Sequence, residues 1–333
     1  MAETMRAAVN TQYGPPAVVD IRDVPQPHPQ QDEVLVQIHA TSVNRTDCGM
    51  RRPHPFFIRL MSGLLRPKRT VLGMEFAGVV RAVGAGVTTF EPGQRVFGMS
   101  PTEYGAHAEY IAVPADGPLA VIPTGTDFDE AVLCEGAWYA HSCLHGVDLE
   151  AGQQILVYGA SGAIGTAAVQ LAKAAGAEVT AVVGTPQLEL AASLGADHVV
   201  DYTAADFTRI GNRFDCVFDA VGKTTYFRCR RLLKPDGVFA TTDLGPFWQN
   251  PLLVLWFAIT RSRRVRLPLP VPADASFIQF VKERVKAGDL RAVVDRTFPL
   301  HAIADAYRYV ETGQKTGVVV IHPAPLEASD SPD

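Results

Sequence analysis

The pattern of apolar and polar positions changes in character along the chain. From residue 5 to about residue 123, short runs that alternate apolar and polar residues are separated by glycine and proline clusters, as in EVLVQIHA and MEFAGVV. Such runs are typical of half-buried β-strands joined by turns. This part of the chain is therefore predicted to form a β-rich domain.

Between residues 152 and 240, strand-like runs alternate with helical patterns. The strand-like runs are ILVYG, VTAVV, HVVDY, CVFDAVG and VFATT, and helices are predicted over 166–175, 187–194 and 225–233. This alternation predicts a parallel, doubly wound sheet. Another helix is predicted to begin at Asp127, where Glu130 completes a capping box, and to run toward Leu144.

The chain closes with a mixture of helices and strands. A helix (FIQFVKERVKAGDL), a strand (VVDRTFPL), a second helix (IADAYRYVETG) and a final strand (TGVVVI) follow one another after residue 273. This order suggests that the β-rich domain is split and resumes at the end of the chain.

Two segments carry apolar residues beside basic ones. We interpret residues 51–70 as a surface loop that tucks Phe56, Phe57 and Leu60 into the core, with a lid or a membrane-surface contact as the alternative. The run Pro251–Ile259 is about half the roughly 20 residues needed to cross a bilayer, so no transmembrane segment is expected. The basic run Arg261–Arg266 after it is interpreted as a solvated face next to an edge strand, and membrane-surface binding stays an alternative.

One stretch carries a chemical signal. Three glycines at three-residue spacing follow the strand Gln154–Tyr158 and open a helix, within a βαβ unit of about 30 residues. At such a turn the backbone can approach a diphosphate, and the helix N-terminus favours an anion. We therefore predict a dinucleotide site in which five residues face the diphosphate, namely Ser161, Gly162, Ala163, Ile164 and Gly165.

The end of the next strand bears on which nucleotide is bound. An acidic residue at this point commonly grips the ribose hydroxyls of NAD, whereas here the strand runs into Gly184 and Thr185. Gly184 leaves room and Thr185 can donate a hydrogen bond, so we predict NADPH as the cofactor. Tyr202 is predicted to cover the adenosine side, with surface packing as the alternative.

Composition narrows the class of protein. The chain has 333 residues and a net charge of −5, which argues against a nucleic-acid partner. Its five cysteines are widely spread and contain no CxxC pair, and the N-terminus has no apolar core of signal-peptide type. A cytoplasmic protein is expected, with a disordered tail over Pro323–Asp333.

The ordered set of motifs resembles a known family. The strings LGMEFAGVVRAVGAGV, EPGQRVFGM, ILVYGASGAIGTAAVQLAKAAGAEV, SLGADHVVDY, LLKPDGVFA and DAYRYVETGQKTGVVVI resemble the medium-chain dehydrogenase/reductase superfamily, in its zinc-free quinone oxidoreductase, zeta-crystallin-like branch. The resemblance covers about residues 5–322.

The resemblance implies a fold, a reaction and an assembly. The fold is α/β: a GroES-like β-rich catalytic domain over 1–123 and 269–333, and a Rossmann NADP(H)-binding domain with a doubly wound parallel sheet over 124–268. The reaction is hydride transfer from NADPH to a quinone or an α,β-unsaturated carbonyl. A homodimer is expected.

The same resemblance gives the positions at which related enzymes bind zinc. These fall at Asn44, Met74 and Cys134. Because a catalytic zinc site needs about three protein ligands and only the cysteine is retained, no metal is expected. Cys134 is then interpreted as a small buried residue.

Further site residues are assigned to the loop after residue 43 and, by resemblance, to the cofactor cleft. In the loop, Asn44 can donate through its amide to an oxygen that gains charge, and Thr46 could pass a proton to solvent as in the zinc enzymes. Asp47 is a third catalytic candidate, although a structural role is favoured. By resemblance, the nicotinamide side is flanked by Ala220, Val221, Thr242, Asp243 and Leu244, and Lys315 could reach the cofactor.

Two other functions stay open. One is an enoyl-thioester reductase of a polyketide or fatty-acid pathway, for which the basic residues Arg51, Arg52, Lys68 and Arg69 could form an entrance. The other is a non-catalytic NADPH-binding protein.

Overall fold

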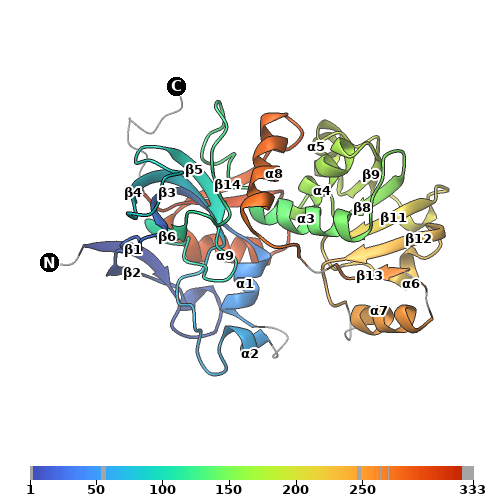
Figure 1. Cartoon of the computed structure of the whole chain (residues 1–333). Helices are drawn as coiled ribbons and strands as arrows, with labels where there is room; N and C mark the ends of the chain where they lie inside the picture. The colour runs from blue at the N-terminus through green and yellow to red at the C-terminus, as the bar shows by residue number, and fades with distance from the viewer. Residues whose placement is uncertain are drawn as a thin grey trace. The chain divides into compact units, whose positions relative to one another are not determined.

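The computed structural model describes residues 3–53, 58–245, 249–260, 262, 264–268 and 270–324. The chain divides into two compact units. The first unit comprises Met1–Cys134, Ala273–Lys286 and Ala292–Asp333, and the second comprises Glu135–Pro272 and Ala287–Arg291. Both units contain helices and strands, so the fold is α/β as predicted (Figure 1). The domain boundaries at 123/124 and 268/269 stay a sequence prediction.

The first unit is built on a mainly antiparallel sheet. Its seven strands are β14 (Val294–Pro299), β15 (Val318–His322), β3 (Glu33–Val43), β4 (Glu75–Val83), β5 (Arg95–Met99) and β7 (Leu119–Val121), in this order, with β6 (Tyr110–Pro114) paired to β3. The strands β1 (Thr4–Val9) and β2 (Asp20–Pro25) form a separate antiparallel pair. The pair β14 and β15 is parallel, and it joins the end of the chain to the N-terminal strands.

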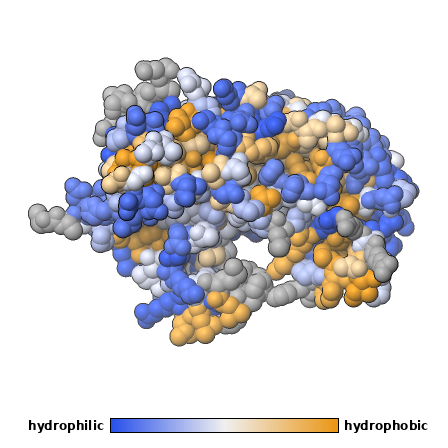
Figure 2. Space-filling view, in the orientation of Figure 1, coloured by the Kyte–Doolittle hydropathy of each residue, from blue (hydrophilic) through white to orange (hydrophobic). Residues whose placement is uncertain are grey.

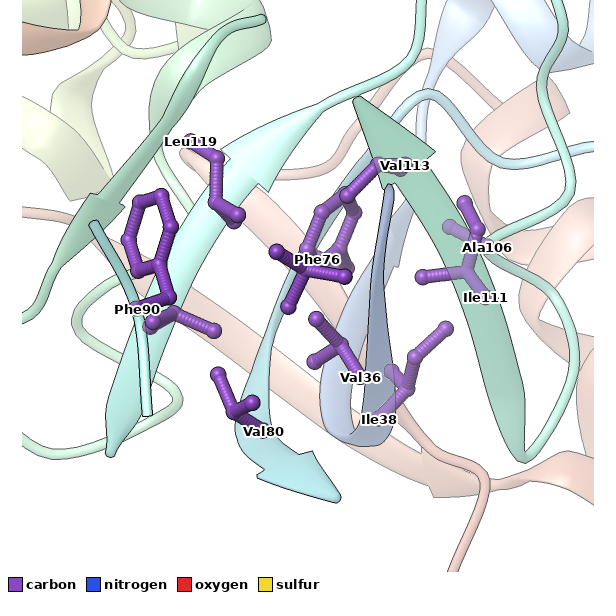
Figure 3. Close-up of a cluster of buried hydrophobic side chains, with 11 residues drawn as sticks. Val36, Ile38, Phe76, Val80, Phe90, Ala106, Ile111, Val113 and Leu119 are labelled. Carbon is purple, nitrogen blue, oxygen red and sulfur yellow. The ribbon is translucent and has the colours of Figure 1, made fainter. Parts of the chain in front are cut away.

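The apolar positions of these strands meet in one core. Figure 3 shows the side chains of Val36, Ile38, Phe76 and Val80 directed toward one another from β3 and β4. Fully burying each such side chain contributes about 1.5–3 kcal/mol relative to leaving it in water. The alternation predicted from the sequence therefore defines the interior of this unit.

Helices complete the first unit. They are α1 (Arg45–Arg51), α2 (Ile58–Ser62), α8 (Ala275–Lys286) and α9 (Ile303–Glu311), together with the 3-10 turns Pro16–Val18 and Leu300–Ala302. Helix α9 buries Ile303, Ala306, Tyr307 and Val310, which follow the helical spacing of an amphipathic face.

The predicted packing of residues 51–70 is wrong for Leu60. This side chain is 70 % exposed, and Leu65 nearby is 85 % exposed. Phe56 and Phe57 lie outside the described residues. The segment therefore presents leucines to solvent between basic residues, because α2 is only five residues long and offers no full apolar face to the core.

The second unit contains a six-stranded parallel sheet. Its order is β10 (His198–Asp201), β9 (Glu178–Val183), β8 (Gln154–Tyr158), β11 (Phe214–Asp219), β12 (Leu233–Thr241) and β13 (Val265–Arg266). Numbered along the chain, this is the order 3-2-1-4-5-6 of a Rossmann fold. The apolar runs in β8 and β11 are continuous because parallel strands of such a sheet are buried on both faces.

The helices of the second unit agree only in part with the sequence prediction. They are α3 (Cys134–Gly146), α4 (Ala163–Ala174), α5 (Leu188–Ser193), α6 (Tyr226–Cys229) and α7 (Gln249–Ile259), with 3-10 turns at Thr185–Gln187 and Phe207–Arg209. The reciprocal bonds of the predicted capping box form, since the Glu130 amide donates to Asp127 and the Asp127 amide donates to Glu130. They close turns rather than a helix, which begins only at Cys134, so the prediction of a helix from Asp127 is wrong.

In the described part of the chain, no helix combines the length and the apolar character needed to span a membrane.

Candidate functional site

The glycine turn of the second unit lies between β8 and α4. Gly159 has a φ of 77°, a left-handed conformation that glycine adopts without strain. A side chain on Gly165 would lie 2.1 Å from the Gly159 carbonyl oxygen, so helix and turn pack too closely for any other residue. At Gly162, by contrast, the nearest atom to an added Cβ would be 3.8 Å away. The first and third glycines therefore shape the turn, and the second leaves open space over it.

This open space is lined by backbone donors. Gly162 is the N-cap of α4, and the first intrahelical bond runs from the Thr166 amide to its carbonyl (2.8 Å). The amides of Ala163, Ile164 and Gly165 precede that bond and have no acceptor within the helix. Together with the positive end of the helix dipole, they form a site that suits a diphosphate. Ser161 is half-buried at the rim of the same turn.

An acidic side chain lies at the end of the neighbouring strands. Thr185 donates its hydroxyl hydrogen to Asp201 Oδ2 (2.6 Å), and the Thr203 amide donates to Oδ1 (2.8 Å). The hydroxyls of Thr185 and Thr203 lower the pKa of the Asp201 carboxyl, so it is ionised at neutral pH. Tyr202 stands over Gly184, with its hydroxyl 3.6 Å from where a Cβ on that glycine would be.

Sequence reasoning missed Asp201. The acidic residue is expected at the end of β9 itself, whereas this carboxylate comes from β10, whose residue Asp201 pairs with Val183 in the parallel register. The signal was present in the string HVVDY, because parallel neighbours end at the same edge of a sheet. Both oxygens of Asp201 accept hydrogen bonds from Thr185 or Thr203.

The loops after β11 and β12 meet at the same edge. Asp219 is buried at the end of β11, and it accepts bonds from the amides of Val221 (3.1 Å), Gly222 (2.9 Å) and Thr224 (3.0 Å). Burial raises the pKa of this carboxyl, and the backbone amides oppose that effect. The bonds hold Val221 against the glycine turn, since its methyl groups would lie within 2.7 Å of a Cβ on Gly159.

The remaining predicted residues of this unit fall beside that loop. Ala220 donates its amide hydrogen to the Tyr158 carbonyl (3.0 Å), and Asp243 lies close against Gly222. Thr242 and Leu244 flank Asp243 directly after β12. The carboxyl ends of five neighbouring strands thus carry every cofactor residue that was predicted for this unit, as expected of a ligand site in a doubly wound sheet.

The first unit contains a buried polar cluster around Asn44. The side-chain amide of Asn44 donates to Ser42 Oγ (2.8 Å) and to Glu75 Oε1 (3.2 Å), and the Ser42 hydroxyl donates to the same Glu75 oxygen. Lys315 Nζ donates to Asn44 Oδ1 (3.2 Å) and to the Gly317 carbonyl. The cluster therefore combines a carboxylate, an amide and an ammonium group on β3, β4 and the loop before β15.

Lys315 was predicted from the resemblance alone to approach a cofactor, a role that stays a prediction. Its contact with Asn44 was not predicted, because 271 positions separate the two residues. Nothing in the local sequence signals such a pairing, which arises only when β15 pairs with β3.

Asp47 holds its own loop and ties it to the segment before β4. Its carboxylate is fully buried and accepts hydrogen bonds from the amides of Asn44 (2.9 Å) and Gly73 (3.1 Å). Burial raises its pKa, while the nearby His107 and these amides favour the charged form. Thr46 lies half-buried in the first turn of α1.

The positions that correspond to zinc ligands do not fit a zinc site. They present an amide, a thioether and a thiol at Asn44, Met74 and Cys134. Burial, reinforced by the nearby Glu75 charge, holds the pKa of the Cys134 thiol well above its usual range, whereas zinc binds the thiolate. Within the ranges that the structure describes, no group of three His, Cys, Asp or Glu side chains is placed to hold a metal ion.

Comparisons of the sequence agree with the fold. Residues 30–124 match the family model of the alcohol dehydrogenase GroES-like domain, and residues 194–321 match that of zinc-binding dehydrogenases. The chain is 30 % identical to a 2-methylene-furan-3-one reductase of Solanum lycopersicum over 334 residues, which cover 96 % of this chain and 80 % of the relative. An NADPH-dependent alkenal/one oxidoreductase of Arabidopsis thaliana matches with the same identity and coverage.

Solved structures show the same architecture. The quinone oxidoreductase from Coxiella burnetii superposes with a TM-score of 0.84 at 25 % identity, over 96 % of this chain and 99 % of the other.

Proposed function

The chain belongs to the medium-chain dehydrogenase/reductase superfamily, and we propose that it is an NADPH-dependent reductase of quinones or α,β-unsaturated carbonyl compounds that works without a metal ion. The observation that carries the proposal is that the chain has two kinds of polar site. One unit has a glycine turn that suits an anion, and the other has a cluster in which the Asn44 amide is bonded to Glu75 and Lys315, an arrangement that does not fit zinc. The relatives named for enone, alkenal and quinone reduction support this substrate class.

The second unit is proposed to bind and orient the dinucleotide. The free amides at the start of α4 would hold its diphosphate, and Val221 over Gly159 would fix the adjoining loop. When bound, NADPH supplies a hydride from its nicotinamide ring.

The first unit is proposed to stabilise negative charge. Reduction of an enone or quinone places charge on the substrate oxygen, and a pre-positioned donor lowers the barrier at that point. Asn44 and Lys315 carry the N–H groups proposed to meet this charge. Both side-chain hydrogens of Asn44 now bond Ser42 and Glu75, so one of these bonds would give way to the substrate oxygen while the other keeps the amide oriented. Asp47 supports this arrangement by fixing the Asn44 backbone, and it is not assigned a direct role.

NADPH rather than NADH is the proposed donor. Strand β9 itself contributes no carboxylate at Gly184 or Thr185, and Asp201 from β10 is engaged by threonine hydroxyls. The enoyl-thioester reductase stays the second candidate, because the same donors would serve that reaction. A homodimer in the cytoplasm is part of the proposal by resemblance.

A substrate panel tests the proposal. We would measure NADPH oxidation with 1,4-benzoquinone, a naphthoquinone, an alkenal and an enoyl-CoA. The wild type is expected to turn over a quinone or the alkenal.

Asn44→Ala should lower kcat by about 100-fold, as for loss of an oxyanion donor, with the NADPH dissociation constant unchanged. Gln37→Ala is the control, because Gln37 lies on β3 and its side chain accepts a hydrogen bond from Arg81 on β4, outside the Asn44 cluster. Exclusive turnover of the enoyl-CoA would favour the second candidate, and no turnover with tight NADPH binding would favour a binding protein.

A further inference from the structure

Helix α7 carries an apolar face that none of the described residues of its own unit covers. Four large side chains, at positions i, i+3, i+4 and i+7, are 59–71 % exposed: Leu252, Leu255, Trp256 and Ile259. Figure 2 shows apolar residues gathered over this helix. Exposed apolar groups of this kind mark interaction sites in soluble proteins, whereas a single exposed leucine does not.

The opposite face of the helix is already used. Leu253, Val254 and Phe257 pack against the core of the second unit, where the Phe257 ring lies edge-on to Tyr226 at 5.2 Å between centroids. The helix has the sequence QNPLLVLWFAI and contains no charged residue. A helix that is apolar all round is normally buried on every side. The outer face of α7 therefore lacks its partner.

The sequence is basic directly after the C-terminal end of α7 but not before its N-terminal end. Four arginines, at 261, 263, 264 and 266, follow its last residue, and positions 244–273 contain no Asp or Glu, although the whole chain has a net charge of −5. Arg261 and Arg263 lie outside the described residues. A strongly apolar stripe next to a local arginine run is complementary to a surface that is both apolar and anionic.

We propose that α7 docks the protein onto the surface of an anionic phospholipid bilayer. The outer face would enter the boundary between headgroups and acyl chains, and the positive charge of the arginine run would be attracted to lipid phosphates. An 11-residue helix is about 16 Å long against a hydrocarbon core of about 30 Å, so α7 would lie in the plane of the membrane rather than cross it. Trp256 suits this depth, because its ring is apolar and its N–H is polar.

A second copy of the chain is the less favourable occupant. In a twofold interface the same patch meets itself, so the arginine run of one copy would approach that of the other with no acidic side chain from the same segment to offset it. Anionic lipid removes this repulsion. The docking proposal does not depend on the proposed reductase activity, because its test measures the binding of the protein to vesicles and not turnover.

Vesicle co-sedimentation tests the proposal with the full chain at physiological salt. The wild type should sediment with vesicles of phosphatidylcholine containing 30 % phosphatidylglycerol. It should bind at least tenfold more weakly to phosphatidylcholine alone or in 0.5 M NaCl. The double substitution Leu255→Ser and Trp256→Ser should lower the partition coefficient at least tenfold. The matched control is Leu65→Ser, which removes an exposed leucine from the other unit and should sediment like the wild type.

Three results would overturn the proposal. One is a wild type that stays in the supernatant with anionic vesicles. A second is a double variant that sediments as well as the wild type. The third is a wild type whose mass by light scattering, without lipid, is twice that of the double variant, since the face would then be covered by a second copy. Thermal unfolding of both variants, expected to match the wild type, shows that binding rather than folding is altered.

Discussion

Asp201 is the residue that we expect to affect the choice between NADPH and NADH most directly. Its carboxylate is ionised and stands beside Thr185, at the edge where the ribose of a bound dinucleotide is expected. A negative charge here opposes a 2′-phosphate, even though hydrogen bonds from two threonines occupy it. The charge of Asp201 therefore opposes the proposed preference for NADPH, and removing this charge should strengthen that preference.

We predict that Asp201→Asn raises the ratio of kcat/KM for NADPH to that for NADH about fivefold, because one exposed like charge costs about 1 kcal/mol at short range. Asp206→Asn is the matched control, since Asp206 accepts bonds from the hydroxyl and amide of Thr208 in the same way. Steady-state kinetics with both nucleotides gives the ratio. An unchanged ratio, or a shift toward NADH, would contradict the assignment of Asp201 to the ribose end.

Residue-level prediction from sequence succeeds where a role depends on neighbours in the chain. The bonds of Asp47 to its own loop follow from its place three residues after Asn44, as in a capping box. It fails where partners come from distant strands. Asp201 and Lys315 take their places only through the register of β10 with β9 and of β15 with β3.

Within the seven residues of the turn between β8 and α4, one glycine is required for packing and another is proposed to be required for binding. Packing requires glycine at position 165, whereas no atom of the protein prevents a side chain at position 162. Aspartate is a better N-cap than glycine, so a carboxylate at position 162 would satisfy helix amides and at the same time repel a diphosphate.

We predict that Gly162→Asp keeps the thermal midpoint at or above that of the wild type but weakens NADPH binding at least 100-fold. Gly165→Ala should lower the free energy of unfolding by about 1–3 kcal/mol, because its methyl group overpacks the turn. Thermal unfolding and fluorescence titration with NADPH separate the two effects. Normal NADPH affinity in Gly162→Asp would remove the diphosphate from this turn.

His322, at the end of β15, pairs with Asp129, and the stability that this pair contributes depends on pH. His322 Nε2 lies 2.7 Å from Asp129 Oδ1, and the hydrogen bond that this carboxylate accepts raises the pKa of His322. A pKa that is raised in the folded state stabilises the protein fully below the pKa of the unfolded chain, about 6.5. That stabilisation is lost as the pH rises through the folded value.

His322→Gln should therefore reduce stability at pH 5.5, by less than about 1 kcal/mol for a partly exposed pair, and have almost no effect at pH 9. Urea unfolding of variant and wild type at the two pH values measures the difference. The exposed His301, substituted in the same way, is the control. A larger loss at pH 9 than at pH 5.5 would reverse the assigned sign.

Helices and strands could be predicted from the sequence where the residues that determine them are close together in the chain. The βαβ unit was recognisable because its strand, glycine turn and helix are all local. The prediction of a helix from Asp127 failed because a capping box stabilises any turn that returns to the cap, and residues 128–131 form turns before α3. The exposure of Leu60 could not be predicted, since an apolar run does not reveal which surface it faces.

At the scale of the whole molecule, the two units are proposed to have different chemical roles. The alternation of strands and helices is sufficient to predict the parallel sheet, and the alternating apolar pattern is sufficient to predict the β-rich unit with its buried core. What no pattern in the sequence supplies is the combination of Asn44, Glu75 and Lys315. By the resemblance, Asn44 is one of the three positions at which related enzymes bind zinc, and here its side chain is hydrogen-bonded to Glu75 and Lys315.

The most direct test is the rate of NADPH oxidation with the preferred quinone or enone, before and after exhaustive chelation, with the metal content measured on the same sample. The account predicts that the metal-free protein keeps the full rate and that added Zn²⁺ does not raise it. Loss of turnover on chelation, restored by one equivalent of Zn²⁺, would contradict the account.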